Sequence, residues 1–246
     1  MKLLLIGAGN MGGAMLGGLK NHDITVVEKH QSKIDKLTNL YKDVKIIKKI
    51  PNIDDYTVIL AIKPQSLNSL NTQGQAKGVI SILAGVSIER LKAAINSKSY
   101  IRAMPNIAAL KQKSVTSLCG DCELKKDAIE ILSGIGKCFW LDNEKELDIA
   151  TGIGGSAPAW ISMVAEALSD GAVKLGLKRD ISYQYAAYML EGVGEMLKDE
   201  HPALLKDKIT SPGGTTAAGA AKLEEGKVRD AFIKAMQECF NKTQKL

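Results

Sequence analysis

The first part of the chain alternates short apolar runs with stretches of helical periodicity. Lys2–Ile6 is an almost continuous apolar run, as expected of a buried parallel strand. Further strands are expected at Ile24–Glu28, Val44–Ile47, Tyr56–Ile62, Gly78–Ile82, Tyr100–Ala103, Val115–Leu118 and, at the sheet edge, Phe139–Leu141. Helices are expected over Gly12–Lys20, Ser32–Leu40 and Ser87–Asn96. This alternation predicts an α/β domain with a Rossmann-like, mainly parallel sheet covered on both faces.

The hydrophobic pattern changes at about residue 145, where strand signals stop. A small-residue helical segment runs from Leu147 to Leu175. Further helices are expected from an N-cap at Asp180 to about Leu197, from His201-Pro202 onward, and over Ala217–Glu224. The last helix carries an apolar face formed by Val228, Ala231, Phe232, Ala235, Met236, Cys239 and Phe240. The pattern predicts two domains, residues 1–145 and an all-α domain of residues 146–246.

An all-helical domain of this size makes a thin core by itself. Its small residues, such as Ala186, Ala187, Gly192 and Gly194, permit close helix contacts. We therefore predict that this domain dimerises with a second copy, as a homodimer or a larger homo-oligomer.

Composition adds little to this picture. The chain is 45% hydrophobic and 24% charged, as in ordinary soluble proteins, and no apolar run is long enough to span a membrane, so a cytoplasmic protein is expected. The net charge of +6 comes from dispersed lysines, which favours a solvated surface over nucleic-acid binding. Cys119 and Cys122 have C-x-x-C spacing, but no second pair completes a ligand set, so no metal is expected.

The strongest motif is the glycine-rich turn that follows the first strand and opens the first helix. It is formed by Gly7, Ala8, Gly9, Asn10, Met11 and Gly12. The first glycine suits a tight turn, the second lets the backbone approach a pyrophosphate, and the third lets helix and strand pack closely. In this context the motif predicts binding of a nicotinamide dinucleotide at the positive end of the helix.

Glu28 ends the second strand, where an acidic residue binds the ribose hydroxyls of NAD and repels a 2′-phosphate. The residues Lys29, His30, Ser32 and Lys33 follow at once and could hold that phosphate if Glu28 turned aside. The sequence thus leaves the choice between NADH and NADPH open.

Two more strand ends carry candidate cofactor contacts. Ala61, Lys63 and Pro64 end the strand expected beside the nicotinamide, and Met104 and Asn106 follow another strand in the same way. Ligands of open parallel sheets bind outside the carboxyl ends of the strands. Either segment, taken alone, is equally well explained as residues that only end a strand and begin a loop.

A second glycine-rich turn, Ser211–Thr216, precedes the expected helix Ala217–Glu224. Its backbone N–H groups at a helix start suit a small anion such as a carboxylate, and Thr215 and Thr216 add hydroxyls. The alternative interpretation is a plain threonine N-cap after a turn.

Together, these motifs resemble the pyrroline-5-carboxylate reductase family. The resemblance rests on the first glycine-rich turn, Ala61–Pro64, Met104–Asn106, Gly155–Ala159 and Ser211–Thr216, in this order. It implies NAD(P)H-dependent reduction of 1-pyrroline-5-carboxylate to L-proline, the last step of proline biosynthesis, at a site completed by dimerisation. It also implies that Ser211, Gly214 and Thr215 bind the substrate carboxylate, and that the hydroxyl of Thr216 contacts the ring nitrogen as the catalytic group.

Two other functions compete with this one. A β-hydroxyacid dehydrogenase would share the two-domain plan, but its catalytic lysine has no counterpart in Ser156–Val173. A non-catalytic dinucleotide-sensing dimer would keep the first turn but has no use for an anion-binding turn at Ser211–Thr216. The proton donor, the effect of proline and activity on related cyclic imines are left open by the sequence.

Overall fold

A computed structural model describes residues 1–245 of the chain. Two compact units are present: residues 1–155 together with 239–245, and Ser156–Glu238. The domain boundary near residue 145 stays a prediction. No helix in the described part of the chain has the combination of length and apolar character that crossing a membrane requires.

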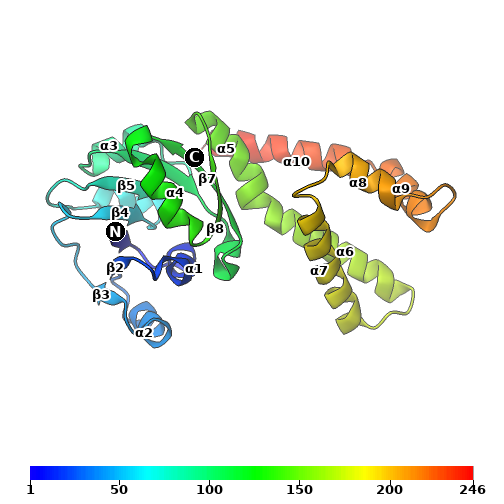
Figure 1. Ribbon diagram of the computed structural model, residues 1–246, viewed down its shortest axis with the longest axis horizontal. Coiled ribbons are helices and arrows are strands. Elements are labelled where there is room, and N and C mark those ends of the chain that lie inside the picture. Colours follow the sequence, from blue (N-terminus) through cyan, green and yellow to red (C-terminus); the bar gives the residue numbers. More distant parts are fainter. Residues whose placement is uncertain (246) are drawn as a thin grey trace. The chain divides into compact units, whose positions relative to one another are not determined.

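The first unit is built on an eight-stranded sheet (Figure 1). The strands are β1 (Lys2–Ile6), β2 (Asp23–Val27), β3 (Lys45–Ile47), β4 (Thr57–Leu60), β5 (Gly78–Ser81), β6 (Tyr100–Met104), β7 (Ser114–Gly120) and β8 (Gly136–Trp140). Their order is β3-β2-β1-β4-β5-β6-β7-β8, and all neighbours except β6 and β7 run parallel. This confirms the predicted mainly parallel, Rossmann-like fold.

Helices cover both faces of this sheet because both faces of its central strands are apolar. The helices of this unit are α1 (Asn10–Leu19), α2 (Gln31–Leu40), α3 (Ile88–Ala94), α4 (Lys125–Ser133) and α5 (Glu144–Thr151). Residues of α1, α2 and α4 share one hydrophobic cluster with Leu3 and Leu5, whereas α3 shares the other with Leu4 and Ile6. Successive side chains of β1 therefore pack into two hydrophobic cores, one on each face of the sheet.

The direction of β7 and the helix α4 depart from the simple alternation of parallel strands and helices. Only the short 3-10 helix Ile107–Lys111 connects β6 to β7. A parallel neighbour requires a longer crossover, so β7 returns antiparallel to β6. The helix α4, which was not predicted from the sequence, then connects β7 to β8, and β8 lies parallel to β7 at the sheet edge.

The second unit is helical. It contains α6 (Ala157–Lys174), α7 (Arg179–Met196), α8 (Pro202–Ile209), α9 (Thr215–Glu225) and most of α10 (Val228–Thr243). The N-cap expected at Asp180 is wrong: Lys178 is the N-cap of α7. Asp180 lies instead in the first turn, where its carboxylate interacts favourably with the helix dipole.

Candidate active site

The glycine-rich turn lies at the point where the strand order reverses. The strands β2 and β4 flank β1, and all three run parallel, so their carboxyl ends meet at one sheet edge. The N–H of Gly7 donates to the carbonyl of Val27, and the N–H of Ala61 donates to the carbonyl of Ile6. Dinucleotides bind at this kind of switch point in open α/β sheets.

The three glycines of the turn differ in their surroundings. Gly7 has φ +95°, and a Cβ there would stand 2.7 Å from the carbonyl oxygen of Ala61. A Cβ on Gly12 would stand 2.4 Å from the carbonyl oxygen of Gly7. For Gly9, by contrast, no heavy atom of the described chain outside Gly9 and its two neighbours lies within 4 Å of the position that a Cβ would take. The structure thus leaves space at Gly9, the residue that the motif places against a pyrophosphate.

The start of α1 borders the same open space beside Gly9. Gly9 is the N-cap and offers no side-chain capping bond, so the first N–H groups of α1 point toward the same space. Ala8 is buried under the turn, Asn10 is exposed and Met11 is half-buried. Because free N–H groups and the helix dipole both favour an anion, these residues fit the pyrophosphate of a dinucleotide.

Glu28 lies directly after β2, beside this turn, and is only 5% exposed. Its Oε2 accepts a hydrogen bond from the N–H of Ala8 at 3.2 Å, and its Oε1 accepts from the N–H groups of Lys29 at 2.8 Å and His30 at 3.0 Å. The ammonium of Lys33 lies 3.6 Å from Oε2. Burial by itself would raise the pKa of the Glu28 carboxyl, but these hydrogen bonds and the Lys33 charge outweigh it and lower the pKa.

The other two strand-end segments lie at the same edge of the sheet. Lys63 is exposed as the N-cap of the 3-10 helix that begins at Pro64. Met104 ends β6 and is half-buried. Asn106 is buried, and its side chain accepts from the N–H of Ala108 at 3.1 Å and donates to the carbonyl of Gly154 at 2.8 Å. The amide of Asn106 therefore holds the π-helical turn Gly152–Ser156 in place.

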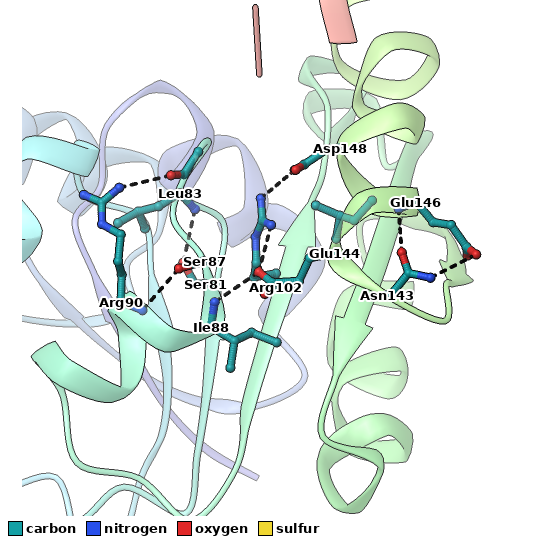
Figure 2. A network of polar contacts seen from close by, with 12 residues as sticks. Ser81, Leu83, Ser87, Ile88, Arg90, Arg102, Asn143, Glu144, Glu146 and Asp148 are labelled. Carbon is teal, nitrogen blue, oxygen red and sulfur yellow. Dashed lines mark hydrogen bonds and ion pairs between the residues drawn. The ribbon is translucent and has the colours of Figure 1, made fainter. Parts of the chain in front are cut away.

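The role of Arg102 was not predicted from the sequence. Its guanidinium, on β6, is 5% exposed and donates to the carboxylates of Glu144 and Asp148, each at 2.9 Å (Figure 2). Glu144 also accepts the N–H of Ile88, the first residue of α3. A charged residue inside an otherwise apolar strand was the available signal, because a buried guanidinium requires acidic partners.

Cys119 faces Arg102 across the β6–β7 pair. Burial raises the pKa of the Cys119 thiol to about 11 despite the nearby guanidinium. Cys122 is exposed. A buried thiol with a raised pKa is a poor nucleophile, which opposes a redox role for Cys119. Among residues 1–245, no group of three or more potential ligands gathers into a metal site.

The second glycine-rich turn lies in the helical unit, at the start of α9. Gly213 has φ +69°, and the N–H of Gly214 donates to the carbonyl of Ser211 at 3.0 Å. The helix begins two residues earlier than expected, so Thr215 and Thr216 occupy its first turn and are exposed. Gly214 is the N-cap, and the threonine N-cap interpretation is wrong. The hydroxyls and the first N–H groups of α9 thus stand together.

These two parts define a class: an oxidoreductase with a Rossmann-type dinucleotide domain and a separate helical unit that carries a second glycine-rich helix start. Residues 144–246 match the family model described as pyrroline-5-carboxylate reductase dimerisation, and residues 2–85 match that of coenzyme F420-dependent NADP oxidoreductase. The chain is 34% identical to the pyrroline-5-carboxylate reductase of Helicobacter pylori over 251 residues, which cover 98% of both proteins. It belongs to the pyrroline-5-carboxylate reductase family.

Solved structures agree with this assignment. The 1-pyrroline-5-carboxylate reductase of Streptococcus pyogenes superposes with a TM-score of 0.87 at 28% identity, covering 100% of this chain and 99% of that one. The pyrroline carboxylate reductase of Plasmodium falciparum, solved with NADP bound, gives a TM-score of 0.80 at 27% identity, with 99% and 98% covered. The match to a dimerisation family supports a homo-oligomer. The roles of individual site residues stay predictions.

Proposed function

We propose that this protein reduces 1-pyrroline-5-carboxylate to L-proline with NAD(P)H, the final step of proline biosynthesis. The observation that carries the proposal is the pairing of two glycine-rich helix starts in one chain of this family, at Asn10 and at Thr215. One suits a pyrophosphate and the other a carboxylate. The substrate contains a carboxylate beside the imine that is to be reduced.

The reduced nicotinamide supplies a hydride for C5 of the imine, and a proton must reach the ring nitrogen. The residues of the sheet unit hold and orient the cofactor. The turn Gly7–Gly12 binds the pyrophosphate, and Ala61, Lys63, Pro64 and Met104 border the nicotinamide end. Asn106 supports this edge through Gly154. The chain's contribution is therefore positioning and exclusion of water.

The residues of the helical unit hold the substrate. Ser211, Gly214 and Thr215 bind the carboxylate at the start of α9. The Thr216 hydroxyl, in the same first turn, hydrogen-bonds the ring nitrogen and orients it for protonation. The proton comes through this hydroxyl or from water, or the imine binds already protonated.

The first test replaces this hydroxyl. Thr216→Ala is expected to lower kcat/KM for 1-pyrroline-5-carboxylate by about 10- to 1000-fold, the range for losing one positioned polar group. Turnover is followed by nicotinamide absorbance. The matched control is Thr38→Ala, an exposed helical threonine of α2 whose hydroxyl donates to Ile34 of the same helix. Unchanged kinetics in Thr216→Ala would remove this residue from the mechanism.

The same assay separates the competing functions. Turnover of a β-hydroxy acid in place of the imine would favour the dehydrogenase, for which Ser156–Val173 supplies no lysine. Cofactor binding without turnover of either substrate would favour the sensor. Within the proposal, the enzyme works in the cytoplasm, where buried thiols such as Cys119 stay reduced.

A further inference from the structure

The carboxylate of Glu28 is fixed on several sides. Three backbone N–H groups donate to it, two to Oε1 from Lys29 and His30 and one to Oε2 from Ala8. The ammonium of Lys33 lies close to Oε2. Turning this side chain aside would remove the acceptor of three N–H groups, one of which, that of Ala8, donates in a buried contact, and leaving a buried donor unpaired is costly. The structure therefore opposes the rearrangement in which Glu28 makes way for a phosphate.

One of these donors, the N–H of His30, belongs to the start of a helix, and the N–H of Lys29 directly precedes it. His30 is the N-cap of α2, it makes no side-chain capping bond, and the first turn of α2 contains no acidic residue. A helix start with free N–H groups is where a 2′-phosphate would find its partners. The carboxylate of Glu28 occupies this position at the start of α2 with a negative charge that belongs to the chain itself.

The basic residues after Glu28 do not change this conclusion. Lys33 is paired with the carboxylate, and Lys29 and His30 contribute their N–H groups to it. A 2′-phosphate at this point would meet a buried, ionised carboxylate at close range. A ribose with two hydroxyls would instead donate to Oε2, because a carboxylate oxygen can accept more than one hydrogen bond.

We propose that Glu28 makes this enzyme selective for NADH over NADPH, by occupying the anion position at the start of α2 and accepting the adenosine ribose hydroxyls. This inference rests on the proposed function only for the identity of the second substrate. The NADP found in the Plasmodium falciparum structure is the ligand of that protein. At the end of β2, this chain presents a fixed negative charge.

The test measures binding of the two half-cofactors, adenosine 5′-monophosphate and 2′,5′-adenosine diphosphate, by calorimetry. We expect the wild-type protein to bind the monophosphate at least about tenfold more tightly, the scale of one close like-charge contact. Glu28→Ser frees the N–H groups of Lys29 and His30, so its ratio of dissociation constants is expected to shift by at least about tenfold toward the diphosphate. The ratio of kcat/KM for NADH and NADPH should move in the same direction.

The matched control is Asp35→Asn. Asp35 lies on the same helix, is exposed and accepts from the side chain of Gln31 at 2.7 Å, so this variant removes one nearby charge without opening the N–H groups. Its ratio of half-cofactor affinities should stay within about twofold of the wild type, since exposed charges are screened. Glu28→Gln, which keeps the size of the side chain, replaces Glu28→Ser if circular dichroism shows the latter unfolded.

Two results would overturn the inference. One is wild-type protein that binds 2′,5′-adenosine diphosphate as tightly as the monophosphate or more tightly. The other is a folded Glu28 variant whose ratio of dissociation constants for the two half-cofactors matches that of Asp35→Asn. Wild-type discrimination that is lost in a Glu28 variant, together with no turnover of 1-pyrroline-5-carboxylate, would instead support the inference and contradict the proposed function.

Discussion

At the scale of single residues, Gly9 and Gly12 have different tasks within one motif. Around Gly12, packing of the helix start against the strand end leaves no room for a side chain. Around Gly9, the described chain leaves open space, and the backbone there has φ −67°, which any residue can adopt. The fold therefore requires Gly12 but not Gly9, and we expect that a bound ligand requires Gly9.

Alanine substitutions separate these tasks. Gly9→Ala is expected to change the free energy of unfolding by no more than about 1 kcal/mol but to weaken NADH binding at least about tenfold, because its methyl group enters the pyrophosphate position. Gly12→Ala is expected to destabilise the protein by about 1–3 kcal/mol, since its Cβ overlaps the carbonyl of Gly7. Urea unfolding and fluorescence titration measure the two effects.

Gly13→Ala serves as the control for both variants. Its Cβ would lie 3.9 Å from the carbonyl oxygen of Ala8, and alanine favours a helix interior. It should therefore leave both measurements unchanged or slightly raise stability. Normal NADH affinity in Gly9→Ala would show that the pyrophosphate lies elsewhere.

At the scale of elements, Arg102 joins three of them. Figure 2 shows its guanidinium directed from β6 toward Glu144 and Asp148 of α5. Glu144 binds the start of α3 as well, and the side chain of Asn143 accepts the N–H of Glu146 to cap α5. Four residues after Arg102, Asn106 binds the turn that follows α5. The end of β6 thus fixes both the beginning and the continuation of α5.

Removing the guanidinium tests this connection. Arg102→Met is expected to lower the free energy of unfolding by about 1–3 kcal/mol, less than for a fully buried pair because Glu144 and Asp148 are 36% and 21% exposed and can be hydrated. Arg102→Lys should not restore stability, since a single ammonium cannot replace the planar fork. Urea unfolding provides the measurement.

Arg90→Met is the matched control for this prediction. Arg90 is exposed, and its guanidinium donates to the carbonyl of Gly85 at 3.1 Å. The expected loss is no more than about 0.5 kcal/mol, as for most surface substitutions. Equal losses in Arg90→Met and Arg102→Met would mean that the network contributes nothing specific.

At the scale of the whole molecule, the helical unit buries few of its apolar side chains within one chain. Ala186 and Leu205 are the buried hydrophobic residues there. The exposed set includes Met163, Leu168, Leu175, Tyr185, Tyr188, Met189 and Ile233. An apolar hollow of about 250 Å³ is lined by Leu168, Ala172, Leu177, Ser182, Tyr185, Ala186 and Met189. An exposed apolar surface of this kind indicates an interface, in agreement with the dimerisation family.

We expect light scattering at micromolar concentration to give a mass of at least twice the 26.4 kDa of one chain. The double variant Tyr185→Asp with Met189→Asp places charges in the apolar hollow and should shift the mass toward the monomer. Leu40→Asp, at an exposed leucine of α2 in the sheet unit, should leave the mass unchanged. A wild-type monomer at this concentration would contradict the prediction.

The fold could be predicted where signals are local. The apolar run of β1 and the glycine-rich turn after it lie within twelve residues, so periodicity and turn chemistry define them without distant partners. The N-cap residue of α7, by contrast, could not be predicted correctly from the sequence. Asp180 and Lys178 stand two residues apart, and an acidic residue suits the first turn as well as the N-cap.

The sequence by itself determined the glycine-rich turn Gly7–Gly12, the mainly parallel sheet, the helical second part and the glycine-rich turn at Ser211–Thr216, because each depends on residues close together in the chain. The tertiary structure alone decided the antiparallel direction of β7, the acidic partners of Arg102 and the orientation of Glu28. These partners are separated by 20 residues for Ala8 and Glu28 and by 42 for Arg102 and Glu144. Such contacts form only when folding brings strand ends together, and no local pattern encodes them.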